Sequence, residues 1–164
     1  MKRIAVLAGL VVLAACDPSG ARHAASLTDA PIHVDDARVG ESLERIAYNG
    51  PWEHITAQAD GRYKATSSRS RHPGASIVFP FNGSVVRVYG VRGPNGGQAA
   101  IGIDGGFYGT ADFYAPQKHV HALVFESPTL AYGTHTLGLV VKVSAAGPHR
   151  AYVNIDEIEV LPRQ

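Results

Sequence analysis

Short runs of alternating apolar and polar residues follow one another along most of this chain. Within Ser76–Phe81, the large apolar side chains of Ile77, Phe79 and Phe81 fall at every second position and so share one face. Thr136–Val143 repeats the alternation with Leu137, Leu139, Val141 and Val143. Because side chains alternate between the two faces of a strand, these runs predict half-buried β-strands.

The same pattern predicts further strands at 85–89, 99–103, 120–125 and 152–160. Asn82-Gly83 is a dipeptide favoured in tight hairpins, so we expect 85–89 to be the return strand of 76–81. The apolar phase slips between Ile155 and Ile158, which predicts a β-bulge near Asp156.

Few residues favour a helix. The range 36–47 is the one candidate, although its residues 42–46 fit a first strand equally well. Seven or eight short strands separated by Gly, Pro and Asn predict an all-β fold, a β-sandwich or jelly roll with mostly antiparallel strands.

The first residues have the features of an export signal. Lys2 and Arg3 precede an apolar run of about ten residues, too short to span a membrane, and small residues precede Cys16. Leu13-Ala-Ala-Cys16 resembles the lipobox of bacterial lipoproteins, which implies cleavage after residue 15 and lipid on Cys16. Asp17 resembles the signal that retains lipoproteins in the inner membrane of enteric bacteria. We therefore expect a cell-envelope protein, held to a membrane by its lipid and facing the periplasm.

The remaining chain divides into a tether, 16–33, and one domain, 34–164. Cys16 is the single cysteine, so the domain forms no internal disulfide and depends on its hydrophobic core. Without residues 1–15, 13 Lys and Arg residues face 14 Asp and Glu residues, a formal net charge of −1. This balance argues against a nucleic-acid partner.

Five segments in one order resemble the galactose-binding-like jelly roll. They are Tyr48-Asn-Gly-Pro-Trp52, 74–83, the pair 86–90 and 101–105, Leu130-Ala-Tyr-Gly-Thr-His-Thr-Leu137, and Val153-Asn-Ile-Asp-Glu-Ile-Glu-Val160. This fold occurs in carbohydrate-binding modules, in accessory domains of glycosidases and esterases, and in domains without a known ligand. The resemblance implies a structural role for His135, and fold alone does not fix function.

Aromatic side chains supply the candidate ligand platform. Tyr108 and Tyr114 belong to a stretch, 107–114, that we expect to be a loop, with Asp104 and Asp112 beside them. Asn95 offers an amide to sugar hydroxyls from another loop, or simply forms a turn. Trp52 is the second choice of platform, with burial beneath the sandwich as its alternative role.

Three carboxylates form the candidate metal site. The resemblance implies a structural calcium where the first and last strands meet, and Asp35, Asp36 and Asp156 fall there. The family's usual pair of glutamates is missing, and Asp156 could instead cap backbone donors. No other cofactor is expected.

Recognised catalytic signatures, such as a nucleophile elbow or a phosphate loop, do not occur, so we expect no enzyme. Two functions fit the chain. A glycan-binding lipoprotein predicts an aromatic groove at the loop end of the sandwich. A structural or protein-interaction module of the envelope predicts an exposed apolar face without a groove. An unrecognised hydrolase is a third possibility.

Overall fold

The computed structural model describes residues 30–143 and 151–162, and β-strands are the main regular structure of these residues. The signal peptide, Cys16 and most of the predicted tether lie outside the described residues. The strands are β1 (Ile32–Asp35), β2 (Ala47–Asn49), β3 (Glu53–Ile55), β4 (Ser67–Ser70), β5 (Ser76–Gly83), β6 (Val85–Arg92), β7 (Gln98–Ile103), β8 (Gly106–Asp112), β9 (His119–Glu126), β10 (Gly133–Val141) and β11 (Val153–Leu161). A short 3-10 turn, η1 (Tyr63–Ala65), precedes β4. The predicted all-β class is confirmed.

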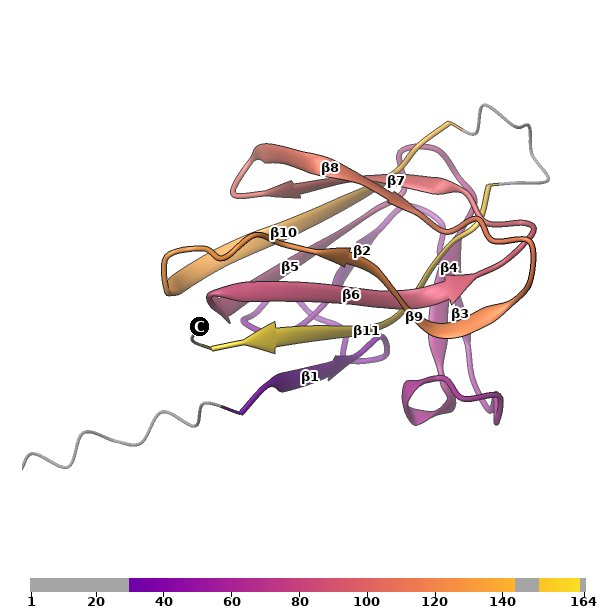
Figure 1. Ribbon diagram of the computed structural model, residues 1–164, viewed down its shortest axis with the longest axis horizontal. Coiled ribbons are helices and arrows are strands. Elements are labelled where there is room, and N and C mark those ends of the chain that lie inside the picture. Colours follow the sequence, from indigo (N-terminus) through magenta and orange to yellow (C-terminus); the bar gives the residue numbers. More distant parts are fainter. Residues whose placement is uncertain (1–29, 144–150, 163–164) are drawn as a thin grey trace, which may run out of the picture.

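Two antiparallel sheets lie face to face (Figure 1). One has the strand order β3-β4-β11-β6-β9, with β1 also paired to β11. The other has the order β2-β5-β10-β7-β8. The predicted sandwich is therefore present. In the part of the chain that the structure describes, no helix has the length and apolar character needed to cross a membrane.

The core lies between the sheets, where the alternating runs meet. Ile77, Phe79 and Phe81 of β5 are fully buried, as their spacing predicts. Leu137 of β10 pairs in register with Phe79, and both side chains face the same interior. Val143, predicted to share the buried face of β10, is 78% exposed because the strand ends at Val141.

β11 is buried along its whole length, because it pairs with β1 and β4 on one side and with β6 on the other. Its register against β6 shifts between Ile155 and Glu157, which confirms the predicted bulge near Asp156. The bulge allows apolar residues on both sides of it to reach the core while Asp156 points elsewhere.

The predicted hairpin at Asn82-Gly83 is wrong. β5 pairs with β2 and β10, whereas β6 pairs with β11 and β9 in the opposite sheet. The chain crosses between sheets at Ser84, whose backbone N–H donates to the carbonyl of Leu161 at 2.8 Å. A Cβ on Gly83 would lie 2.5 Å from the Cγ1 atom of Val160, so this glycine permits close approach to β11 and not a hairpin turn.

The structure also differs from three other local expectations. Residues 106–112, expected to be loop, form edge strand β8, whose hairpin with β7 turns at Asp104 and Gly105 with φ of 51° and 79°. Residues 36–47 contain no helix, although Ile46 is fully buried. β1 begins at Ile32, two residues inside the range predicted to be tether.

Candidate functional site

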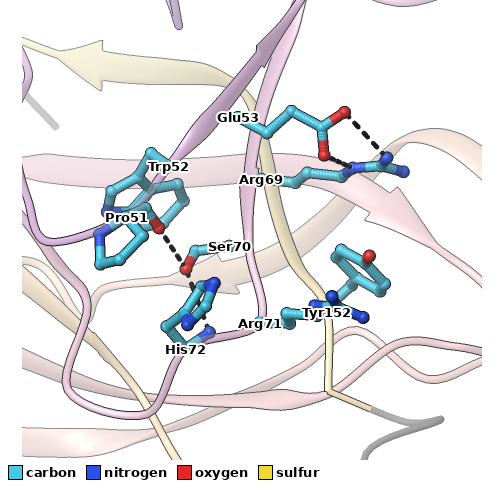
Figure 2. A pocket seen from close by; sticks show the side chains of 8 residues that line it. All are labelled: Pro51, Trp52, Glu53, Arg69, Ser70, Arg71, His72 and Tyr152. Atoms are coloured by element: carbon cyan, nitrogen blue, oxygen red, sulfur yellow. Dashed lines mark hydrogen bonds and ion pairs between the residues drawn. The ribbon is translucent and has the colours of Figure 1, made fainter.

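A hollow of about 280 Å³ opens beside the edge strand β3 and its neighbour β4. We call it the Trp52–Tyr152 hollow. Figure 2 shows the two rings on opposite sides, with Ser70 and His72 between them. It is lined by Pro51, Trp52, Glu53, Arg69, Ser70, Arg71, His72 and Tyr152.

Strand pairing assembles one wall of this hollow. β4 and β11 are antiparallel, and Arg69 pairs with Asn154. Arg71 follows Arg69 by two residues and Tyr152 precedes Asn154 by two, so continuing the antiparallel pairing places both just beyond the strand ends, on the same face as Arg69. The guanidinium carbons of Arg69 and Arg71 lie 4.8 Å and 5.7 Å from the centre of the Tyr152 ring. Both arginines thus hold this ring by cation–π contact.

Trp52 forms the opposite wall and also packs against the core. Its ring meets that of Tyr48 edge-on, with 5.1 Å between ring centres. Its indole N–H donates to the carbonyl of Asn49 at 3.2 Å. Trp52 is therefore a half-buried side chain that packs on the core and lines the hollow, and its role as a ligand platform stays a prediction.

Charge at the rim of the hollow is fixed by one bidentate ion pair. Arg69 donates from Nε and Nη2 to the two carboxylate oxygens of Glu53, at 2.8 Å and 3.1 Å (Figure 2). These bonds hold the pKa of Glu53 below its ordinary value and raise the pKa of Arg69. The carboxylate and the guanidinium both stay charged, and their two hydrogen bonds fix their orientation. Groups held in this way suit hydrogen bonding to sugar hydroxyls.

Ser70 and His72 connect the chain segments at the floor of the hollow. The Ser70 hydroxyl donates to the carbonyl of Pro51 at 2.7 Å, and the backbone N–H of His72 donates to the Ser70 hydroxyl at 3.2 Å. These hydrogen bonds connect the segment just before β3, at Pro51, to the segment just after β4, at His72.

A second hollow of about 230 Å³ adjoins the first and shares Arg69 and Tyr152 with it. We call it the Arg62–Arg92 hollow. Asn95, one of the ligand residues predicted from the sequence, lines this hollow. Its backbone carbonyl accepts the backbone N–H of Tyr152 at 3.1 Å. The site residues predicted from the sequence do not include Arg62, Arg69, Arg92, Lys118 and Tyr152, because only the pairing of distant strands brings these side chains together.

The other sequence-predicted ligand residues line neither hollow. Tyr108 is 41% exposed on β8. Asp104 accepts hydrogen bonds from His135 and from the backbone N–H of Thr136, which fixes the β7–β8 turn and agrees with a structural role for His135. Asp112 accepts the backbone N–H of Tyr114 at 2.9 Å. Binding by these residues stays a prediction.

The carboxylates considered for calcium lie close together, as expected. The backbone N–H of Asp36 donates to the carbonyl of Asp156 at 3.3 Å, and Asp35 and Asp36 both accept from the Thr66 hydroxyl. Burial raises the pKa of Asp36 and of Asp156. Asp156 accepts the backbone N–H of Tyr63, which is the capping role considered for it.

Over residues 30–143 and 151–162, no group of three or more His, Cys, Asp or Glu side chains could hold a metal ion. Hydroxyl and backbone donors already occupy oxygens of all three aspartates. A bound calcium ion stays a prediction.

Sequence comparison relates the chain to carbohydrate-active enzymes. No protein-family profile matches it. Two curated proteins of Flavonifractor plautii are similar. The A type blood N-acetyl-alpha-D-galactosamine deacetylase is 32% identical over 112 residues, which cover 68% of this chain and 14% of that protein. The A type blood alpha-D-galactosamine galactosaminidase is 29% identical over 106 residues, which cover 63% and 9%. The chain thus spans about one seventh of the first relative and less of the second.

Solved structures share the fold at lower sequence identity. A family two carbohydrate esterase from Cellvibrio japonicus aligns with a TM-score of 0.52 and 17% identity, covering 81% of this chain and 33% of that one. The Podospora anserina GH26-CBM35 beta-(1,4)-mannanase aligns with a TM-score of 0.53 and 16% identity, covering 82% and 28%. The jelly-roll fold of carbohydrate-active proteins, expected from the sequence resemblance, is confirmed at the level of fold.

The expectation that the chain is no enzyme is contradicted by these comparisons. Both curated relatives are named as enzymes, a deacetylase and a galactosaminidase. The solved structures include a carbohydrate esterase and a glycoside hydrolase family 43 arabinofuranohydrolase. The expectation rested on the absence of known catalytic motifs. Such motifs identify only enzyme classes whose sequence signature is already known.

Proposed function

We propose that this chain is an exported, lipid-anchored β-sandwich that binds glycans at the Trp52–Tyr152 hollow. Through this binding it takes part in the enzymatic processing of carbohydrates. The observation that carries the proposal is the placement of two aromatic rings on opposite sides of one hollow, with a fixed Glu53–Arg69 ion pair at its rim. Sequence relatives that act on carbohydrates support the same conclusion.

Sugar chemistry matches this arrangement. The C–H face of a sugar ring packs well on an aromatic plane, and Trp52 and Tyr152 both offer ring surface to the hollow. Sugar hydroxyls exchange hydrogen bonds with water for bonds of similar strength, so affinity depends on donors and acceptors already held in place. The Glu53–Arg69 pair is held in this way by its two hydrogen bonds.

The relatives suggest the first sugars to try. Their names specify N-acetyl-alpha-D-galactosamine and alpha-D-galactosamine of A type blood structures. We propose glycans ending in α-linked galactose-type sugars as the primary ligand class.

A glycan array on residues 17–164, with Cys16 removed, tests the proposal. We expect binding to a related set of glycans, and loss of that binding in Tyr152→Ala. An array without any bound glycan, obtained with folded protein, would contradict the proposal.

The membrane anchor is the second part of the proposal. The site lies far from the point where the preceding chain enters the fold. Ile32 pairs with Val160 at the end of β11, whereas Tyr152 precedes its beginning, roughly 25 Å away for a strand of this length. Figure 1 shows β1 starting at the left end and β3 and β4 at the right. The hollow and the point where the chain enters the fold therefore lie at opposite ends of β11.

Replacing Cys16 by Ser tests the anchor. We expect the variant to leave the membrane fraction and to lose the lipoprotein-specific cleavage, because two or three acyl chains supply the membrane affinity. Wild-type levels of membrane association in this variant would contradict the anchor.

An envelope-docking function is a second candidate, and one observation favours it. A shallow apolar depression of about 320 Å³ lies on the β5–β10–β7–β8 surface, where Val78, Phe107 and Val140 are 39%, 74% and 43% exposed. This is the exposed apolar face that a docking module predicts. Binding of an envelope protein that Val140→Ser abolishes, together with a blank glycan array, would favour this second function.

A further inference from the structure

The Arg62–Arg92 hollow carries an excess of positive charge. Four cationic side chains line it, those of Arg62, Arg69, Arg92 and Lys118. Asp60 pairs with Arg62 and Lys118, and Glu53 pairs with Arg69, while neither carboxylate lines the hollow. Four cations against two carboxylates leave two positive charges uncompensated.

The fold leaves two of these cations incompletely satisfied. Arg62 has a side chain only 7% exposed, and its buried Nε–H has no acceptor within the described residues. Arg92 donates from Nη2 to the carbonyl of Tyr114 at 3.0 Å, but its buried Nε–H also lacks an acceptor. Over the described ranges, no carboxylate lies within ion-pair distance of Arg92. A buried guanidinium N–H without an acceptor is unfavourable, and an anion beside it offsets that cost.

Amide groups accompany the charge. Asn154 is 6% exposed, lines the hollow, and has a buried Oδ1 atom that accepts no hydrogen bond. Asn95 lines the same space. A ligand that suits this wall carries an anionic group for the guanidinium side chains and hydroxyl groups for the amides. An acidic sugar has both.

We propose that the Arg62–Arg92 hollow is a subsite for an acidic sugar, one that carries a carboxylate or sulfate group. This inference rests on the proposed glycan-binding function and deepens it. Because Tyr152 and Arg69 line both hollows, a glycan bound at the Trp52–Tyr152 hollow can place a neighbouring acidic unit here. The volume, about 230 Å³, lies below the ~300–1,000 Å³ common for drug-sized ligands, so the subsite takes one sugar unit and not a chain.

Matched sugars test the subsite by calorimetry on residues 17–164, with Cys16 removed. The probes are galacturonic acid and galactose, which differ only at C6 (a carboxylate in the acid, a hydroxymethyl group in galactose), and galactose 6-sulfate. We expect the acid to bind about tenfold more tightly than galactose, or better, at low salt, and the margin to shrink as salt is added. Tight binding of galactose 6-sulfate as well would show that the subsite accepts either anion. Equal affinity for galacturonic acid and galactose would overturn the proposal.

Arginine variants show whether the preference arises in this hollow. Arg92→Gln should remove the preference for the acid. Arg45→Gln is the matched control, because Arg45 also donates to one backbone carbonyl, that of Val39, yet lines neither hollow. If Arg92→Gln does not fold, Lys118→Gln, whose side chain is 54% exposed, replaces it. An undiminished preference in the folded variant would overturn the subsite.

The result separates this inference from the proposed function. Galactose binding that Trp52→Ala removes, without any preference for the acid, would leave the proposed function standing and overturn the subsite. Binding of the acid that depends on Arg92 but not on Trp52 would support the subsite and contradict the platform. Failure of all three sugars and of the glycan array would overturn both.

Discussion

The guanidinium of Arg69 lies 4.8 Å from the centre of the Tyr152 ring while its nitrogens donate to both carboxylate oxygens of Glu53. This single arginine therefore sets the position of the aromatic wall and the direction of the charge at the rim. Its side chain is 32% exposed, so the pair remains accessible to a ligand. Arg69 and Tyr152 also separate the two hollows, so a ligand that spans both must pass over them.

Tyr152→Ala is the first prediction for glycan binding. Its ring lines both hollows and packs mainly against arginine side chains, so its loss removes ligand contact and little core. We expect affinity to fall about tenfold, as for the loss of one aromatic contact and its buried area. The melting temperature should change by only a few degrees. Calorimetry with a glycan from the array and a thermal melt measure the two effects.

Two other aromatic substitutions complete this test. Trp52→Ala should lower both affinity and melting temperature, because Trp52 packs on the core as well as lining the hollow. Tyr108→Ala, on edge strand β8, should leave both nearly unchanged. Weaker binding in Tyr108→Ala and unchanged binding in Tyr152→Ala would move the site to β8, where sequence analysis placed it.

Phe79→Ala should cost about 3–5 kcal/mol of stability, through lost transfer free energy and a cavity. Phe79 is fully buried, and its ring centre lies 6.1 Å from that of Phe81. Val78→Ala is the matched control on the opposite face of the same strand, where Val78 is 39% exposed, and should cost less than about 1 kcal/mol. Urea denaturation measures both. Similar losses in the two variants would mean that β5 does not bury the Phe79 face.

Period-two alternation was enough to predict the sandwich and its core. Ile77, Phe79 and Phe81 are buried because a strand in a sandwich has one inward face, and the pattern states which one. The phase slip around Asp156 likewise predicted a real bulge. Local turn chemistry was less informative at Asn82-Gly83, since a turn dipeptide does not tell whether the next strand stays in the same sheet.

The candidate site could not be predicted in the same way. Tyr152 meets Arg71 only because β11 pairs with β4 in one particular register. That register follows from the burial of the whole of β11, a property of both sheets together. Tyr108 was favoured because Gly105 and Gly106 suggested a loop, whereas they form the end of a hairpin.

The Asp104–His135 pair should contribute stability over a limited pH range. The His135 Nδ1 atom lies 2.7 Å from Asp104 Oδ2, and this contact lowers the pKa of Asp104 and raises that of His135. A lowered carboxyl pKa gives stability that is lost as pH falls below the ordinary value of 3.8. A raised histidine pKa gives stability that is complete below the ordinary value of 6.5 and is lost as pH rises through the folded value. The contribution is therefore greatest between these two values.

Asp104→Asn measures this contribution. Because the Asp104 side chain is 50% exposed, solvent screening limits the loss to about 1 kcal/mol or less near pH 5, and it should shrink towards pH 8. Asp112→Asn is the control, since Asp112 accepts the backbone N–H of Tyr114. A loss in Asp104→Asn that stays constant from pH 5 to about pH 8 would contradict a charged pair.

His121 compensates a fully buried carboxylate, and this gives the last prediction. The His121 Nδ1 atom lies 2.9 Å from Asp156 Oδ2, and its Nε2 atom lies 3.2 Å from Glu157 Oε2. Burial raises the pKa of Asp156, while the hydrogen bond from His121 works against that rise. Without His121, the pKa of Asp156 should rise further, so ionised Asp156 becomes more costly to bury at neutral pH.

We therefore expect His121→Asn to lose about 1–3 kcal/mol at pH 7, less than for a fully buried pair because the His121 side chain is 36% exposed. His121 has a positive φ of 52°, which asparagine tolerates. The measured loss of stability therefore contains no added backbone strain. The loss should shrink as pH falls through the raised pKa of Asp156, because the protonated carboxyl carries no buried charge for the hydrogen bond to offset. In an Asp156→Asn background the same change should cost clearly less, since the buried charge is already gone. Urea denaturation of the four proteins at pH 7 and about pH 4 measures this coupling. Equal losses at both pH values and in both backgrounds would mean that His121 stabilises the fold by packing on Tyr89, whose ring lies 4.7 Å away, and not by compensating Asp156.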